Sequence, residues 1–121
     1  MIRGIGCDLV KIDRLKRPLE KEHFVERVFT EEERRILKAS GDPVTFAAGR
    51  WAAKEAVVKA LGTGFSGCNP GDISVERDER GAPVVRFLGK AESILKMGER
   101  IHVTITHERE YAAAFVVWEG E

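Results

Sequence analysis

Glu55 and Lys59 lie four residues apart in the segment RWAAKEAVVKALGTG, which spans residues 50–64. On an α-helix this spacing places the two side chains one turn apart on the same face. The segment ends in Gly62-Thr63-Gly64, and a turn bracketed by glycines can present backbone N–H groups to an anion. A carboxylate, an ammonium group and a turn of this kind point toward a phosphorylated ligand and a metal ion.

Two interpretations of the Glu55 and Lys59 pair are open. As an exposed helical ion pair it would contribute only roughly a few tenths of a kcal/mol to stability. Most neighbours on that face are apolar or small, namely Trp51, Ala52 and Val58. A half-buried carboxylate among them needs a cation, which either Lys59 or a metal ion would supply.

Asp8 is the second acidic candidate, because it interrupts the strand-like run IRGIGCDLV over residues 2–10, which is otherwise apolar on both faces. Asp8 is either a capping carboxylate at the end of that strand or an oxygen ligand for a metal. Two carboxylates from different elements, together with waters and phosphate oxygens, are a usual way to hold Mg²⁺. The spacing alone does not show that Asp8 meets Glu55.

The turn at residues 62–64 and His107 are weaker candidates. Gly62 fits the residue that ends a helix, and the negative end of the helix dipole disfavours phosphate there. A phosphate at this turn would depend on backbone N–H groups and nearby cations. His107 ends a predicted strand, and it is either a polar loop residue or a phosphate donor or proton carrier.

The order of helix-like and strand-like segments that must position these residues predicts one α+β domain over residues 1–121. Its strands are expected to be mostly antiparallel. Alanines and periodic apolar residues predict a central helix from about Thr45 to Leu61. Thr30 and Glu33 form a capping box that starts a helix to about Ala39. The other expected elements are a strand over 2–10, a basic helical stretch over 11–21 with Pro18 inside it, a helical stretch over 23–28, a hairpin of strands 73–77 and 84–88, a short helix over 89–97, and strands over 101–106 and 111–118.

The composition narrows the class of protein. Lys and Arg total 20 and Asp and Glu total 20, so the zero net charge does not favour a nonspecific nucleic-acid binder. Cys7 and Cys68 fit no CxxC spacing, which favours free thiols in a reducing compartment. There is no signal-peptide pattern and no apolar run of the roughly 20 residues that a membrane helix needs. We therefore expect a cytoplasmic protein with no membrane or nucleic-acid partner.

Taken together, three motifs resemble the holo-(acyl-carrier-protein) synthases, the small bacterial type of phosphopantetheinyl transferase. The N-terminal motif is GIGCDLV over residues 4–10, and the central signature is FAAGRWAAKEAVVKALGTG over residues 46–64. The C-terminal motif is VTITH over residues 103–107 together with YAAA over 111–114. The resemblance runs nearly end to end. It implies the 4'-phosphopantetheinyl transferase-like fold, a mostly antiparallel sheet packed around a long central helix.

The resemblance also implies an activity. Members of this family transfer the 4'-phosphopantetheine arm of coenzyme A to a serine hydroxyl of an apo acyl carrier protein and release adenosine 3',5'-bisphosphate. Carried over to this sequence, Asp8 and Glu55 would hold Mg²⁺, and Lys59 would face the phosphates. Arg50 would contact the nucleotide end of coenzyme A. Further residues of the coenzyme A pocket would be Gly62, Thr63, Gly64 and His107.

Partners follow from the same resemblance. The carrier protein is acidic, and Arg14, Arg17 and Lys21 would share one basic helical face for docking it. Pro18 departs from a regular helix and puts Arg17 and Lys21 in more doubt than Arg14. Family members of this size form homotrimers with pockets between subunits, and the apolar terminal strands of this chain are compatible with a trimer core.

Some roles stay open at this point. The general base for the serine hydroxyl is a water near the metal, Glu55 or His107. Basic residues common in the family before the central helix are missing here, where residues 41–44 read GDPV. The residue that binds the 3'-phosphate of coenzyme A could be Arg50, His107, Arg77 or Arg80. A binding module without activity and a protein–protein adaptor remain the rival functions.

Overall fold

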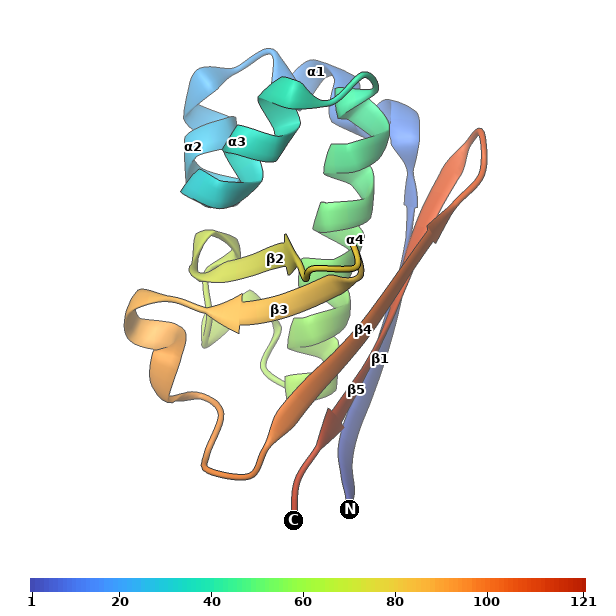
Figure 1. The fold of residues 1–121 in the computed structure, drawn as a ribbon. Coiled ribbons are helices and arrows are strands. Elements are labelled where there is room, and N and C mark those ends of the chain that lie inside the picture. Colours follow the sequence, from blue (N-terminus) through green and yellow to red (C-terminus); the bar gives the residue numbers. More distant parts are fainter.

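A computed structural model describes residues 1–121 and has the α+β architecture that the sequence predicts (Figure 1). Helix α4 (Pro43–Leu61) is central. One side of it packs on a three-stranded antiparallel sheet in the order β1-β5-β4, formed by β1 (Ile2–Lys11), β5 (Tyr111–Glu119) and β4 (Arg100–His107). The other side meets α3 (Glu31–Ala39) and β2 (Ile73–Arg77), while α2 (Glu22–Val28) packs on α3 and β3 (Pro83–Phe87) pairs with β2.

Local signals define both ends of α4. Asp42 caps its start, since the Thr45 N–H donates to Asp42 Oδ1 at 3.2 Å and Pro43 occupies the first helical position. The helix therefore begins two residues before the predicted start. Gly62 adopts a left-handed φ of 76° and ends the helix as predicted.

Two glycines bring β1 against the backbone of α4. A Cβ on Gly4 would lie 2.1 Å from the Ala60 carbonyl oxygen, and a Cβ on Gly6 would lie 2.1 Å from that of Ala56. On the inner face of β1 the two glycines are followed by Asp8 and the buried Val10, while Ile5 and Leu9 lie on the other face. This other apolar face is open in the single chain, since Ile5 is 61% exposed and Leu9 is 65% exposed.

The predicted basic helix over residues 11–21 is broken. A 3₁₀ turn at Ile12–Leu15 is followed by the four-residue helix α1 (Lys16–Leu19), and Lys21 has an extended backbone at the start of α2. Pro18 lacks an N–H and its ring hinders a longer helix. By contrast, α3 has the predicted capping box, with Thr30 and Glu33 bonded to each other's backbone N–H groups.

The segment between β3 and β4 also differs from its prediction. The expected helix over residues 89–97 is only a 3₁₀ turn at Gly89–Ser93, followed by irregular chain. Glycines with left-handed φ bracket it at Gly89 and Gly98, and Ala91 is the one buried side chain of the turn. So short a segment with so little apolar surface to bury does not sustain an α-helix. No helix in the structure is both long enough and apolar enough to cross a lipid bilayer.

Candidate active site

Lys59 pairs with Asp8 across the contact between α4 and β1. Its ammonium lies 3.1 Å from Asp8 Oδ1 and donates to the Cys7 carbonyl oxygen at 3.0 Å. The glycines of β1 permit this contact, because they bring the strand close to the helix. Lys59 makes no ion pair with Glu55, so the interpretation of the two as a simple helical surface pair is wrong.

Glu55 projects from α4 toward Asp8 and is half-buried. Burial raises the pKa of Glu55, and the negative charge of Asp8 raises it further, while Lys59 partly opposes both. The two carboxylates line one cavity of about 380 Å³ together with Arg14 and Trp51. The structure thus brings Asp8 and Glu55 together in one cavity, a proximity that their spacing in the sequence could not show.

The donor set of this cavity fits a hard divalent cation. No cluster of three or more His, Cys, Asp or Glu side chains could form a complete metal site by itself. Mg²⁺ does not need one, because it usually keeps several waters and is bound through one or two carboxylates plus substrate phosphates. A cation between Asp8 and Glu55 would also relieve the repulsion that raises the pKa of Glu55.

A second cavity, of about 390 Å³, brings together Arg50 from α4, Arg77 from β2 and His107 from β4, with Asp42 also in its lining. Arg50 is only 7% exposed, and its Nε has no hydrogen-bond partner. The guanidinium carbons of Arg50 and Arg77 lie 4.4 Å and 5.6 Å from the centre of the Phe46 ring. Burial and the charge of Arg77 lower the pKa of Arg50 to about 10. Two adjacent guanidinium groups, one with an unpartnered N–H, favour an anion.

The two cavities share no lining residue within one chain. His107 lines the arginine cavity with Arg50 and does not line the cavity of Asp8 and Glu55. One copy of the chain therefore keeps the carboxylates and the arginines apart.

The turn at Gly62-Thr63-Gly64 has fewer free backbone N–H groups than predicted. The Gly62 N–H donates to the Lys59 carbonyl and the Thr63 N–H donates to that of Val58, so both N–H groups close the helix. None of the three turn residues lines either cavity. The prediction of a ready-made phosphate turn is wrong for these two N–H groups, because the helix end uses them first.

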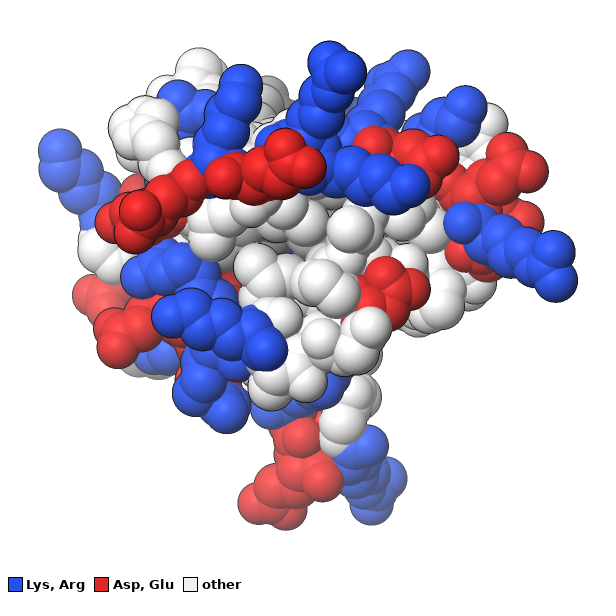
Figure 2. Space-filling model, turned by 90° about the horizontal axis from the view of Figure 1, so that it is seen from above, with Lys and Arg blue, Asp and Glu red and all other residues white.

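The basic residues expected to dock a partner do not share one helix face. Arg14 lies in the 3₁₀ turn, Arg17 in α1, and Lys21 before α2. All three are exposed, and Figure 2 shows Lys and Arg side chains gathered over this end of the molecule. Of the three, only Arg14 also lines the cavity of Asp8 and Glu55.

Sequence reasoning missed the role of Phe46, which it assigned to the buried face of the central helix. Phe46 lies in the lining of the arginine cavity beneath two guanidinium groups. Its position four residues before Arg50 was the available signal, since aromatic and cationic side chains at that spacing meet on a helix.

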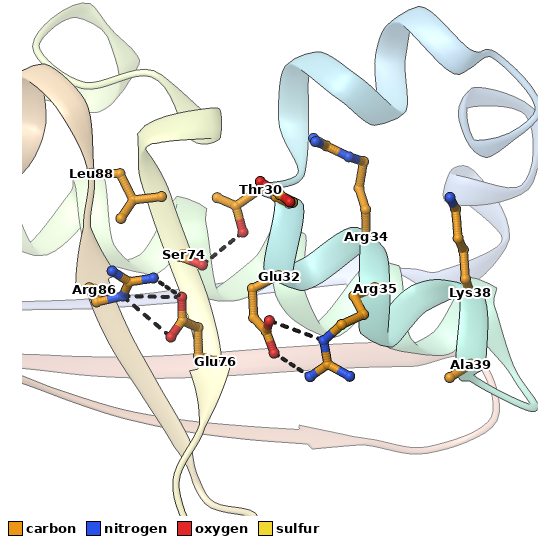
Figure 3. A pocket seen from close by; sticks show the side chains of 11 residues that line it. Thr30, Glu32, Arg34, Arg35, Lys38, Ala39, Ser74, Glu76, Arg86 and Leu88 are labelled. Atoms are coloured by element: carbon orange, nitrogen blue, oxygen red, sulfur yellow. Dashed lines mark hydrogen bonds and ion pairs between the residues drawn. The ribbon is translucent and has the colours of Figure 1, made fainter.

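A larger cavity of about 880 Å³ lies between α3 and the β2–β3 hairpin (Figure 3). Its arginines are already bonded, with Arg35 paired to Glu32 and the Arg86 guanidinium 2.9 Å from Glu76. Arg34 donates to the Phe29 carbonyl at 2.5 Å. Since its cations are mostly satisfied, this cavity is a weaker anion site than the one around Arg50.

Comparison with known proteins identifies the family of the chain. The sequence pattern of the 4'-phosphopantetheinyl transferase superfamily matches residues 4–116. A holo-(acyl-carrier-protein) synthase of Maridesulfovibrio salexigens is 49% identical over 98% of this chain and 99% of its own, and one of Halothermothrix orenii is 45% identical over 98% of both.

Solved structures are similar over the whole fold. The Bacillus anthracis holo-(acyl-carrier-protein) synthase, solved in complex with CoA (3',5'-ADP), has a TM-score of 0.85 and 37% identity, covering 100% of this chain and 99% of its own. The Neisseria meningitidis enzyme has a TM-score of 0.86 and 35% identity, covering 98% and 99%. With this match over nearly its full length, the chain belongs to the holo-(acyl-carrier-protein) synthases of the 4'-phosphopantetheinyl transferase superfamily.

Proposed function

We propose that this enzyme transfers the 4'-phosphopantetheine arm of coenzyme A to a serine hydroxyl of an apo acyl carrier protein, with Mg²⁺, and releases adenosine 3',5'-bisphosphate. The observation that carries the proposal is the shared cavity of Asp8 and Glu55, with Lys59 bonded to Asp8. The complex of the Bacillus anthracis relative with CoA (3',5'-ADP) supports coenzyme A as the donor.

The residues of this cavity suit displacement at a pyrophosphate. The serine oxygen forms a bond to the β-phosphorus as the bond from that phosphorus to the bridging oxygen breaks, and the leaving group carries away the electron pair. Asp8 and Glu55 would hold Mg²⁺, which neutralises charge on the pyrophosphate. Lys59 supplies a further positive charge there, on a flexible stem long enough to leave Asp8 for a phosphate oxygen.

The serine proton needs an acceptor. Glu55 is one candidate, because its carboxylate lines the cavity that the serine hydroxyl would enter. A water beside the two carboxylates is the other. His107 is the weaker choice, since within one chain it lines the other cavity.

The arginine cavity is proposed as the site of the nucleotide end of coenzyme A. Arg50 offers an unpartnered N–H, and His107 lines the same cavity. Arg77 stands beside Arg50 over the same aromatic ring and supplies a positive charge that residues 41–44 lack. We assign the 3'-phosphate to Arg50 and Arg77 rather than to Arg80, which does not line this cavity.

A homotrimer would join the two cavities. The outer face of the β1-β5-β4 sheet exposes large apolar side chains, with Phe115 46% exposed beside Ile5 and Leu9. An apolar sheet face of this kind favours burial against another copy. The carboxylate cavity of one subunit would then meet the arginine cavity of its neighbour.

Arg14 is proposed to lead the docking of an acidic carrier protein. It borders the cavity where the serine must arrive, and the exposed Arg17 and Lys21 follow it closely in the chain. Such charges accelerate association and lose their effect as salt rises. We also predict that the carrier protein belongs to fatty-acid or polyketide synthesis and that the enzyme is cytoplasmic.

One experiment tests the function. The protein is incubated with coenzyme A, Mg²⁺ and an apo acyl carrier protein, and the carrier is weighed by mass spectrometry. We expect a gain equal to one phosphopantetheine arm, lost with EDTA and with Glu55→Ala. Coenzyme A binding with no mass gain would instead support a binding module.

A further inference from the structure

The core holds an ion pair that takes no part in the chemistry described above. The Lys54 ammonium, on α4, lies 2.7 Å from Glu33 Oε1, on α3. Both side chains are 0% exposed. Removing two charges from water is costly, and a buried pair of this kind is weak support for stability by itself. Its presence beside the candidate active site therefore calls for another explanation.

Further hydrogen bonds connect the pair to several other elements. Lys54 also donates to the carbonyl oxygens of Pro70 at 2.8 Å and Ile73 at 2.5 Å, which completes its three donors. Glu33 accepts from the Thr30 N–H at 2.8 Å and, through Oε2, from the Val75 N–H at 2.7 Å. The pair thus joins α4 to the start of α3, to the loop before β2 and to β2.

A hydroxyl pair extends this network beyond the ion pair. Thr30 Oγ1 lies 2.7 Å from Ser74 Oγ, across the gap between α3 and β2 (Figure 3). Glu33, the N3 residue of α3, is thereby fixed by the helix cap on one side and by the hairpin on the other. The partner that Lys54 contacts is consequently itself rigid.

Apart from Arg50 and Lys54, the fully buried residues of α4 are small, and two of its alanines, Ala56 and Ala60, pack on the glycines of β1. The buried small residues are Ala47, Ala48, Gly49, Ala52, Ala53, Ala56, Val57, Val58 and Ala60. A smooth surface of this kind interlocks less than one with long side chains, so rotation and sliding of the helix meet less resistance.

The rotation of α4 decides where the reactive side chains point. Lys54 directly precedes Glu55 and lies five residues before Lys59 on the same helix. A rotation of about 20° moves a group roughly 5 Å from a helix axis by about 2 Å. A displacement of even about 1 Å at a reacting group can lower a rate by roughly a hundredfold.

We propose that Glu33 and Lys54 are positioning residues, which fix the rotation and register of α4 so that Glu55 and Lys59 face Asp8. The directional bonds of the pair set the helix where apolar contacts alone would not. This inference rests on the proposed transferase reaction, because its main readout is the rate of that reaction.

The test replaces the pair with apolar residues of similar size, Glu33→Leu with Lys54→Met. These changes also remove the side-chain partners of the Pro70 and Ile73 carbonyls and of the Thr30 and Val75 N–H groups, so the melting temperature should fall. Well below that temperature, where the variant is folded, we expect a kcat lowered at least tenfold and faster amide hydrogen exchange in α4. A folded double variant with wild-type kcat and wild-type exchange in α4 would overturn the inference.

A matched control removes the partly exposed Glu76–Arg86 pair on the hairpin, with Glu76→Gln and Arg86→Met, and should change neither kcat nor exchange in α4. If the apolar double variant does not fold, Glu33→Gln alone keeps the shape of the side chain but presents an amide donor to the Val75 N–H or to Lys54. We expect kcat to fall about tenfold under conditions where this variant is folded, and an unchanged kcat would contradict the inference. An inactive wild-type protein would refute the proposed function instead, so the two failures are distinguishable.

Discussion

The ammonium group of Lys59 lies 3.1 Å from the carboxylate of Asp8 and leaves Glu55, one turn earlier on the same helix, without an ion pair. The lysine therefore neutralises the strand carboxylate and not the helix carboxylate. A divalent cation that binds both carboxylates would take over this role. Lys59 would then be free to contact the pyrophosphate of coenzyme A.

The first prediction concerns Lys59. Lys59→Met should lower kcat about a hundredfold, as expected when one charged group that stabilises developing phosphate charge is removed. Folding should be little affected, since Lys59 is an exposed residue. Steady-state kinetics with coenzyme A and apo carrier protein measure the effect. Lys96→Met, at another exposed lysine, is the control, and equal rates for the two variants would contradict the role of Lys59.

The second prediction concerns pH and the metal-free protein. The ordinary pKa of Glu55 is 4.5 and its pKa in the folded protein is higher, so the folded state binds the proton more tightly than the unfolded state. The stability that this provides is present below pH 4.5 and is lost as pH rises through the raised pKa. At neutral pH the ionised Glu55 therefore destabilises the metal-free fold.

Glu55→Gln should remove that destabilisation. Urea denaturation in EDTA should show the variant more stable than the wild type at pH 7, with the difference shrinking toward pH 4.5. Glu79→Gln, at an exposed turn residue, should show no such pH-dependent gain. A Glu55→Gln variant that is less stable than the wild type by the same amount at both pH values would be inconsistent with a strained carboxylate.

The third prediction concerns the metal. Mg²⁺ that binds only the folded protein should stabilise it by about 2.7 kcal/mol at a hundred times its Kd. Asp8→Asn should abolish this gain, because it removes one of the two carboxylates of the cavity. Denaturation curves with and without Mg²⁺ measure the effect without any turnover. An equal gain for the wild type and Asp8→Asn would place the metal elsewhere.

The sequence predicted the fold better than it predicted the placement of side chains. The capping box of Thr30 and Glu33 and the helix end at Gly62 depend on local chemistry, and both predictions are confirmed. The exposure of Ile5 and Leu9 could not be predicted, because it depends on how Gly4 and Gly6 let β1 lie against α4. Alternation along the strand shows two faces but not which face meets the core.

The candidate site shows the same limit. The spacing of Glu55 and Lys59 correctly placed both on one helix, but it suggested that they pair with each other. The pairing of Lys59 with Asp8 joins residues 51 positions apart, and such contacts are a property of the tertiary fold. The Glu33–Lys54 pair escaped notice for a similar reason, since nothing local marks a lysine as buried.

The fourth prediction tests which hairpin arginine, Arg77 or Arg80, binds the 3'-phosphate of coenzyme A. Arg77→Ala should raise the KM for coenzyme A about tenfold or more, as for the loss of a charge-assisted bond to phosphate. The KM for 3'-dephospho-coenzyme A should not change, because that substrate lacks the phosphate assigned to Arg77. Arg80→Ala should leave both values unchanged, since Arg80 does not line the cavity. If Arg80→Ala gave the selective effect instead, the assignment to Arg77 would be wrong.

The last prediction concerns assembly. Phe115→Arg places a charge on the exposed apolar face of the sheet, so it should convert a trimer to monomers without unfolding the chain. Light scattering measures the mass, and circular dichroism checks the fold. A monomeric wild-type protein under active conditions would refute the trimer directly.

Subunit mixing tests whether the site spans two copies. Glu55→Ala inactivates the carboxylate cavity and Arg50→Met inactivates the arginine cavity, so each variant alone should be inactive. In randomly mixed trimers, roughly a quarter of the interfaces join the intact carboxylate cavity of one variant to the intact arginine cavity of the other. Refolding the two together should therefore restore about a quarter of the wild-type activity. No recovery in correctly assembled trimers would mean that each chain builds its site alone, and the separation of the two cavities would then require a movement within one subunit.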